Sequence, residues 1–252
     1  MTLKYFSIAL DSDDYLIPNE PDSEFPFSVS SIVSDFSFQS FYLSEFIQKR
    51  LIKERFKANS YNQIIIRGRK KEGKRLVFKK HLNSLNIEIP FDEKKYKELY
   101  PYKNKYPLLS LIKPVENDNL FSEFLISMVV EGMTKARDEK TEYLYDFIID
   151  TTLDFKANGG KNEWVHQDKV FKAYDLKTIL FCKLTANYFA LEFLIEKNNK
   201  ILFRKEILKT LPSEIQYGDE YKDVTIKDGK FIITKNIKKG SSLFTLPISE
   251  LS

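Results

Sequence analysis

The sequence has 252 residues, of which 42% are apolar and 30% charged, and this composition is typical of a folded globular protein. It excludes collagen-like and disordered chains, and the length suffices for one or two domains. The net charge of +4 is close to balance, so the chain as a whole is neither strongly acidic nor strongly basic. The single cysteine, Cys182, excludes an internal disulfide bond and gives no sign of an oxidising compartment.

The apolar stretch near the N-terminus is short, because it runs from Tyr5 to Leu10 and acidic residues begin at Asp11. A signal peptide needs a basic start and a longer apolar centre. No uninterrupted apolar run reaches the ~18 residues that a membrane-spanning helix needs. The sequence therefore predicts a cytoplasmic protein with no membrane partner.

The charge is distributed unevenly along the chain. Residues 1–60 carry a net charge of −3, residues 61–113 carry +9 and residues 114–252 carry −2. Six carboxylates and no Lys or Arg lie in the acidic loop, residues 11–24, while the basic residues are densest from Arg67 to Lys80. These two segments are the surfaces that a charged partner meets first.

In the N-terminal part, hydrophobic periodicity predicts a strand over residues 4–10 and a proline-containing loop after it. Apolar residues spaced three or four apart predict an amphipathic helix over residues 40–56. Residues 63–69 and 75–80 flank a turn-like segment and predict a β-hairpin. A short strand over residues 86–90 and a short helix after Asp92 follow.

Beyond Pro114 the pattern predicts two helices, the second ending at the glycine pair Gly159-Gly160. Three strands are then expected over residues 176–185, 188–196 and 200–208. A hairpin over residues 223–235 has the dipeptide Asp228-Gly229 at its turn, which is a strong hairpin signal.

Strands and helices are segregated along the chain rather than alternating. This order predicts an α+β fold with antiparallel β-sheets and no doubly wound parallel sheet. The polar segment from Lys113 to Asn119 suggests a boundary between an N-terminal α+β lobe with a basic hairpin, residues 1–113, and a helical pair followed by an antiparallel sheet, residues 114–252. One compact unit over residues 1–252 remains the alternative.

The acidic loop suggests a protein partner, since carboxylates can mimic the phosphates that a basic protein binds, and two nearby phenylalanines offer apolar anchors. The expected contact residues are Asp11, Asp13, Asp14, Glu20, Asp22, Glu24, Phe25 and Phe27. Inhibitors and immunity proteins of bacterial toxins act in this way without catalysis. A toxin encoded nearby is accordingly the most concrete partner.

The basic region offers the alternative partner, RNA or DNA, because cations bind phosphates and interleaved tyrosines stack on bases. The residues expected to bind are Arg67, Arg69, Lys70, Lys71, Arg75, Tyr96, Tyr100 and Tyr102. A further alternative is a metal-independent ribonuclease that uses His81 and His166 with a lysine. If residues 162–168 are extended, Trp164, His166 and Asp168 face the same side.

No catalytic motif is present, since the sequence has no phosphate-binding loop, no nucleotide-binding glycine motif and no G-x-S-x-G serine. Histidines and cysteines do not occur at metal-ligand spacing, so neither a metal nor a cofactor is expected. Cys182 lies in an apolar segment and is expected to be buried. The function that the sequence favours is a non-catalytic protein-binding module of the inhibitor or immunity type.

Overall fold

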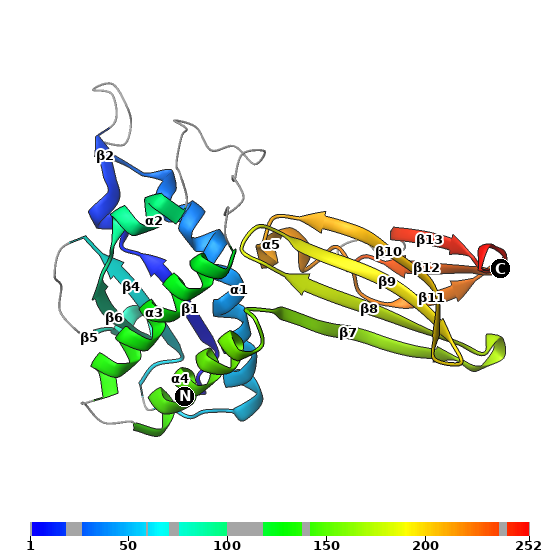
Figure 1. Ribbon diagram of the computed structural model, residues 1–252, viewed down its shortest axis with the longest axis horizontal. Helices are drawn as coiled ribbons and strands as arrows, with labels where there is room; N and C mark the ends of the chain where they lie inside the picture. Colours follow the sequence, from blue (N-terminus) through cyan, green and yellow to red (C-terminus); the bar gives the residue numbers. More distant parts are fainter. Residues whose placement is uncertain are drawn as a thin grey trace. The chain divides into compact units, whose positions relative to one another are not determined.

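The computed structural model describes residues 2–18, 27–58, 60–70, 76–99, 118–137, 142–236 and 241–251. The chain divides into two compact units, residues 1–160 and 161–252 (Figure 1). The boundary expected after residue 113 lies outside the described residues. The two helices that follow it belong to the first unit, where they pack on the N-terminal sheet and on the helix Ser31–Glu54.

The first unit is built on a four-stranded mixed sheet. Its strands, in spatial order, are β1 (Tyr5–Leu10), β4 (Gln63–Arg69), β6 (Ser84–Pro90) and β5 (Leu76–Lys79). β1, β4 and β6 run parallel to one another, and β5 is antiparallel to β6. The predicted hairpin of β4 with β5 is therefore wrong. Ile64, Ile65 and Ile66 are all buried, and a strand that is apolar on both faces belongs in the interior of a sheet, where β6 takes the place beside it.

The helix α1 (Ser31–Glu54) closes the free edge of β1 with polar side chains. Ser44 Oγ accepts a hydrogen bond from the Ile8 amide at 3.2 Å, and Gln48 Oε1 accepts one from the Phe6 amide at 3.3 Å. Ser40 Oγ donates to the Ile8 carbonyl at 2.9 Å. An edge strand otherwise presents unpaired backbone groups, so this polar stripe on the helix takes the place of a further strand.

The described residues of the first unit also form the helices α2 (Glu93–Leu99), α3 (Asp118–Arg137) and α4 (Glu142–Ala157). α3 approaches the sheet closely at Gly132, where an added Cβ atom would lie 2.9 Å from Ile66 Cδ1. α4 packs on α3 and α1 and ends, as predicted, at Gly159 and Gly160, both at φ +70°. Short elements also occur: η1 (Ser12–Tyr15), β2 (Leu16–Pro18), β3 (Phe27–Val29) and η2 (Lys80–Leu82).

An aromatic cluster fills the space between α1, α2 and α3. The Tyr96 ring is completely buried, 5.3 Å from the Phe36 ring and 5.6 Å from the Phe91 ring, and Phe121 and Phe124 lie beside it. The Tyr96 hydroxyl donates a hydrogen bond to Gln39 Oε1 at 2.9 Å. Tyr96 is therefore part of the hydrophobic core.

The second unit consists of two antiparallel sheets. The strands of the larger sheet are β7 (Asn162–Phe171), β8 (Leu176–Leu184), β9 (Phe189–Lys197) and β10 (Lys200–Thr210), and those of the smaller are β11 (Val224–Lys227), β12 (Lys230–Thr234) and β13 (Ser242–Pro247). The short elements are η3 (Lys172–Tyr174), α5 (Glu214–Tyr217) and η4 (Ile248–Glu250). The predicted turn at Asp228-Gly229 is confirmed, with φ of 49° and 69°, values that match the twist of a hairpin.

The two sheets of the second unit pack face to face through phenylalanines. The Phe193 ring lies 6.0 Å from the Phe231 ring and 6.2 Å from the Phe244 ring. Cys182 is completely buried, as expected, and its thiol contacts the Tyr221 hydroxyl at 3.4 Å. The α+β class is confirmed; both sheets of this unit are antiparallel, and the four-stranded sheet of the first unit is mixed.

Candidate functional site

Charged side chains gather at the carboxyl ends of the three parallel strands of the first unit. Asp11 and Asp14 follow β1, Arg69 and Lys70 lie at the end of β4, and Glu93 follows β6. α1 begins in the same region, with Ser30 as its N-cap residue. In sheets with parallel strands, ligands and partners commonly bind at this end, where the loops after neighbouring strands meet. We therefore take this end of the sheet as the candidate site.

At the centre of the site, Arg69 binds three carboxylates. Its guanidinium nitrogens lie 2.9 Å from Asp11 Oδ2, 3.0 Å from Asp14 Oδ2 and 3.3 Å from Glu88 Oε1. The side chains of the three acids are only 7%, 10% and 9% exposed. Burial acts to lower the pKa of Arg69, but the three carboxylates outweigh it and raise the pKa. Arg69 thus supplies the positive charge that these buried acids require.

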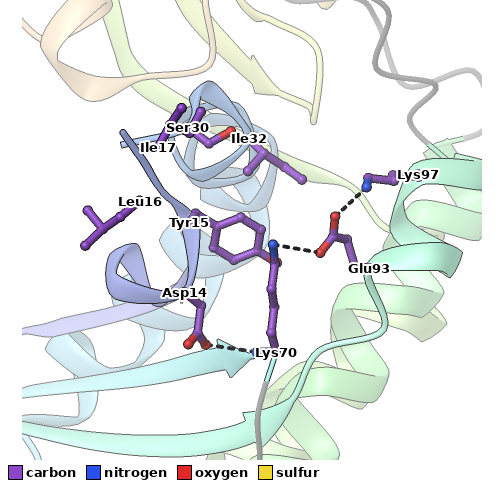
Figure 2. A pocket seen from close by; sticks show the side chains of 9 residues that line it. All are labelled: Asp14, Tyr15, Leu16, Ile17, Ser30, Ile32, Lys70, Glu93 and Lys97. Atoms are coloured by element: carbon purple, nitrogen blue, oxygen red, sulfur yellow. Dashed lines mark hydrogen bonds and ion pairs between the residues drawn. The ribbon is translucent and has the colours of Figure 1, made fainter. Parts of the chain in front are cut away.

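Beside this cluster is a pocket of about 220 Å³ (Figure 2). Its lining comprises Asp14, Tyr15, Leu16, Ile17, Ser30, Ile32, Lys70, Glu93 and Lys97. Lys70 crosses the pocket, since its ammonium lies 3.9 Å from the centre of the Tyr15 ring and 3.2 Å from Glu93 Oε2, and its backbone amide donates to Asp14 Oδ2 at 2.9 Å. Lys97 forms an ion pair with Glu93 as well.

These contacts determine the protonation of the groups in the pocket. Burial raises the pKa of Tyr15, and the nearby Glu93 and Asp14 carboxylates raise it further, so the phenol remains protonated. Burial also acts to raise the pKa of Glu93, but the hydrogen bonds from Lys97 and Lys70 outweigh it and lower the pKa. Among the described residues, the buried Tyr15 hydroxyl has no hydrogen-bond partner. Glu93 is paired with Lys70 and Lys97 inside the pocket, and Asp14 is paired with Arg69 beside it.

The rim of the pocket is apolar and exposed. Leu16 and Ile17 of β2 are 45% and 48% exposed, and Val29 of β3, which pairs with Leu16, is 50% exposed. We call these three residues the apolar ribbon. Leu16 and Val29 pair directly and share one face of the two strands, whereas Ile17 points to the opposite face (Figure 2). Large aliphatic side chains exposed beside a charged pocket are typical of a contact surface for another protein.

The acidic loop that the sequence indicated is in part an internal structure. Asp11 and Asp14 bind Arg69, and Asp11 also accepts a hydrogen bond from the Asp13 amide at 3.0 Å. Asp13 is exposed to solvent. Phe27 lies in β3, but its side chain is not among those described. The expected contact residues Glu20, Asp22, Glu24 and Phe25 lie outside the described residues.

The three described basic residues that were expected to contact phosphates are engaged within the protein. Arg67 Nε donates to Asn86 Oδ1 at 3.0 Å, and Arg69 and Lys70 bind the carboxylates described above. Tyr96, expected to stack on a base, is buried in the core. Lys71, Arg75, Tyr100 and Tyr102 lie outside the described residues.

The two histidines belong to different units. His81 is an exposed residue of η2 in the first unit. His166 lies in β7 of the second unit at an irregularity in the pairing with β8, where Val165 pairs with Phe181 and Gln167 pairs with Leu180. This bulge reverses the alternation of side chains, so Trp164 and Asp168 do not face the same side, and the expectation that they do is wrong. Asp168 instead pairs with Lys177, and the His166 ring packs edge-on against Tyr221 at 4.8 Å.

The sequence did not single out the titratable residues Tyr15, Glu88, Glu93 and Lys97 of the site, nor the apolar ribbon, Ser30 or Ile32. They became significant only because β1, β4 and β6 are parallel, which brings the ends of the three strands to one edge. The signal that was available is a strand followed directly by Asp11, a long helix and a second apolar strand, which is the order of a β-α-β unit.

Among the described residues, no group of three His, Cys, Asp or Glu side chains is arranged to hold a metal ion. Within the same ranges, no helix is long and apolar enough to cross a membrane. No family model, no curated protein and no solved structure matches this chain.

Proposed function

We propose that this chain is a non-catalytic, cytoplasmic protein-binding module of the inhibitor or immunity type, which neutralises a partner such as a bacterial toxin. The observation that carries the proposal is the apolar ribbon beside the pocket in the first unit. Leu16, Ile17 and Val29 are each about half exposed, and burial of such side chains against a partner is a principal source of binding energy.

The charges around the ribbon fit a binding role better than a catalytic one. A general acid or base must be able to exchange its proton with a substrate. Here the carboxylates of Asp11, Asp14 and Glu88 are held by Arg69, and Glu93 is held by two lysines. Fixed, mutually paired charges next to apolar side chains supply orientation and selectivity to a protein interface.

The nucleic-acid alternative receives less support from the described residues. Arg67 and Arg69 are engaged with side chains of the sheet and the strand ends, and the buried ring of Tyr96 offers no face to a base. Titration with single-stranded RNA at low and high salt discriminates between the two functions, because phosphate binding weakens steeply as salt rises. Tight, salt-dependent binding would favour the nucleic-acid alternative.

The proposal is tested by isolating the tagged full-length chain from its native cell and identifying any protein that accompanies it in stoichiometric amount. The double variant Leu16→Lys and Val29→Lys should lose that partner, with a loss of binding free energy of about 2 kcal/mol or more. Ile215→Lys is the matched control, since Ile215 is 91% exposed but lies in α5 of the second unit.

The identified partner is then co-expressed with each variant. If the partner is a toxin, wild type and Ile215→Lys should restore growth, and the double variant should not. Circular dichroism establishes that every variant is folded. Absence of any stoichiometric protein partner, or full binding by the folded double variant, would contradict the proposal.

A further inference from the structure

The larger sheet of the second unit has one face packed on the smaller sheet and an opposite face, which we call the outer face. Residues that pair directly across neighbouring strands point to the same side, so the pairing register defines rows of outer-face residues from β7 to β10. The rows are Val170, Lys177, Glu196 and Ile201; Asp168, Ile179, Leu194 and Arg204; Val165, Phe181, Glu192 and Glu206; and Glu163, Lys183, Ala190 and Lys209.

The outer face is more apolar than a solvated sheet face ordinarily is. Val165, Val170 and Ile201 are 53%, 62% and 52% exposed, and Ile179 and Phe181 between them are half-buried. A one-sided antiparallel sheet usually presents polar residues to water. Val165, Val170 and Ile201 lie on the edge strands β7 and β10, while Ile179, Phe181 and Leu194, which is 9% exposed, lie on the central strands. Apolar side chains interspersed with charges on an exposed face are typical of a protein interface.

We propose that the outer face binds the outer face of a second copy of this chain, through a two-fold axis that runs parallel to the strands between β8 and β9. Rotation about such an axis involves no shift along the strands. Each row therefore lies opposite the same row of the second copy in reversed strand order. β7 then faces β10 of the second copy, and β8 faces β9.

This symmetry places opposite charges against each other. In the second row, Asp168 faces Arg204 of the second copy and Ile179 faces Leu194, so an apolar pair is flanked by ion pairs. In the first row, Lys177 faces Glu196 of the second copy, because the register of the strands puts both residues in that row. Every contact occurs twice, because the second copy returns it.

The remaining two rows are compatible with this arrangement. In the fourth row, Glu163 at one edge of the sheet faces Lys209 at the other. In the third row, Glu192 and Glu206 face Phe181 and Val165, so the two acids do not face each other. No like charges are directly opposed in any row.

A two-fold axis that is also parallel to the sheet but perpendicular to the strands is less favourable. It would reverse the order of the rows instead of the strands, which places Lys177 opposite Lys183. It leaves one pair of opposite charges, Arg204 with Glu206, where the axis parallel to the strands gives three. Like charges that face each other across an interface disfavour binding. The pattern of the outer face therefore selects the axis parallel to the strands.

Asp168 and Arg204 already have ion-pair partners on their own sheet, Lys177 at 3.4 Å and Glu192 at 2.6 Å. In the dimer these pairs extend into networks that continue across the interface. The inference does not rest on the proposed function, because it concerns only the second unit and a second copy of this chain.

The test measures the mass of the purified full-length chain in solution by sedimentation velocity over a range of concentrations. Wild type should sediment as a dimer at the higher concentrations. Asp168→Arg places two arginines opposite each other at two symmetric positions and should yield a monomer. The exchange of both residues, Asp168→Arg with Arg204→Asp, restores opposite charges and should restore the dimer.

Lys227→Asp is the control for a change of surface charge, since Lys227 is exposed on β11 of the smaller sheet, away from the outer face. It should leave the dimer intact. A wild-type chain that is monomeric at every concentration would overturn the inference. So would a dimer that persists in Asp168→Arg, or an exchange variant that is folded but monomeric.

Discussion

Replacement of Arg69 by methionine tests whether the charge cluster at the strand ends is an internal structural element. Methionine preserves much of the length and apolar volume of the arginine stem but removes the guanidinium. Asp11, Asp14 and Glu88 would then be left together, each at most 10% exposed, without the cation that lies 2.9 to 3.3 Å from their oxygens.

The expected loss of unfolding free energy is large. Removal of one partner from a buried ion pair typically costs about 3–5 kcal/mol, because the other charge remains buried without compensation. Arg69 is itself 24% exposed, which lets water reach the cluster and places the expected loss near the lower value, about 3 kcal/mol. Since a domain is stable by about 5–15 kcal/mol, the first unit would lose a substantial part of its stability.

The assay is urea unfolding followed by far-UV circular dichroism, which reports mainly the first unit because α1, α2, α3 and α4 all lie there. The loss should shrink in acid, since protonated carboxyl groups no longer repel one another. Arg50→Met is the matched control. Arg50 pairs with Asp154 at 3.6 Å on the surface, and the loss of such a pair costs at most about 1 kcal/mol.

Equal losses in Arg69→Met and Arg50→Met would refute the reasoning, because they would mean that the buried carboxylates do not depend on the guanidinium. A loss that is large but independent of pH would point to packing rather than charge.

Four further changes test other parts of the structure. In the second unit, burial acts to raise the pKa of Asp223, but hydrogen bonds from neighbouring side chains outweigh it and lower the pKa. The carboxylate thus stabilises the fold above its ordinary pKa of 3.8, and this contribution is lost as the pH falls through the lowered value. Asp223→Asn should therefore be less stable than wild type at neutral pH, by Trp164 fluorescence in urea, and the difference should vanish in acid; a pH-independent difference would count against the linkage. Burial raises the pKa of Asp35, so Asp35→Asn, which removes a buried charge, should increase stability at neutral pH, and thermal unfolding at pH 7 that gives a lower midpoint than wild type would disprove it. Tyr96→Phe should lower the unfolding free energy by about 1–3 kcal/mol through loss of a buried hydrogen bond, and an unchanged urea midpoint would contradict the placement of its hydroxyl. Gly229→Ala should cost about 1–2 kcal/mol because φ is +69° at the hairpin turn, and no measurable cost would speak against that turn geometry.

Elements defined by local patterns were predicted well from the sequence. The three strands from residue 176 to residue 208, the hairpin at Asp228-Gly229 and the helix stop at Gly159-Gly160 all depend on residues that are neighbours in the chain. Periodicity and turn residues act over a few positions, so one sequence is enough to identify them.

Strand pairing was predicted poorly for β4, because its partner depends on distant residues. Segments 63–69 and 75–80 are close in sequence and flank a turn-like segment, yet β6 lies between them. The run Ile64, Ile65 and Ile66 is apolar on both faces, which favours an interior strand, but it does not specify which strand lies beside it.

The candidate site was likewise predicted only where it depends on residues that are close in sequence. Its acidic half was recognisable from the sequence, since Asp11 and Asp14 lie in a segment without basic residues. Their pairing with Arg69 could not be recognised from the sequence, because 55 residues or more separate the partners along the chain. From the sequence, a carboxylate that follows a strand and is buried in an ion pair cannot be distinguished from an exposed carboxylate. Only the parallel pairing of β1 with β4 shows that Asp11 and Asp14 are buried.

The sequence alone therefore determined the α+β class, most of the helices and strands, and the uneven charge of the N-terminal part. Tertiary structure decided what those charges do, because burial and pairing depend on atoms that are adjacent in space rather than along the chain. It brought Asp11 and Asp14 of the acidic segment into one cluster with Arg69 of the basic segment. It also left the apolar side chains of Leu16, Ile17 and Val29 exposed beside that cluster.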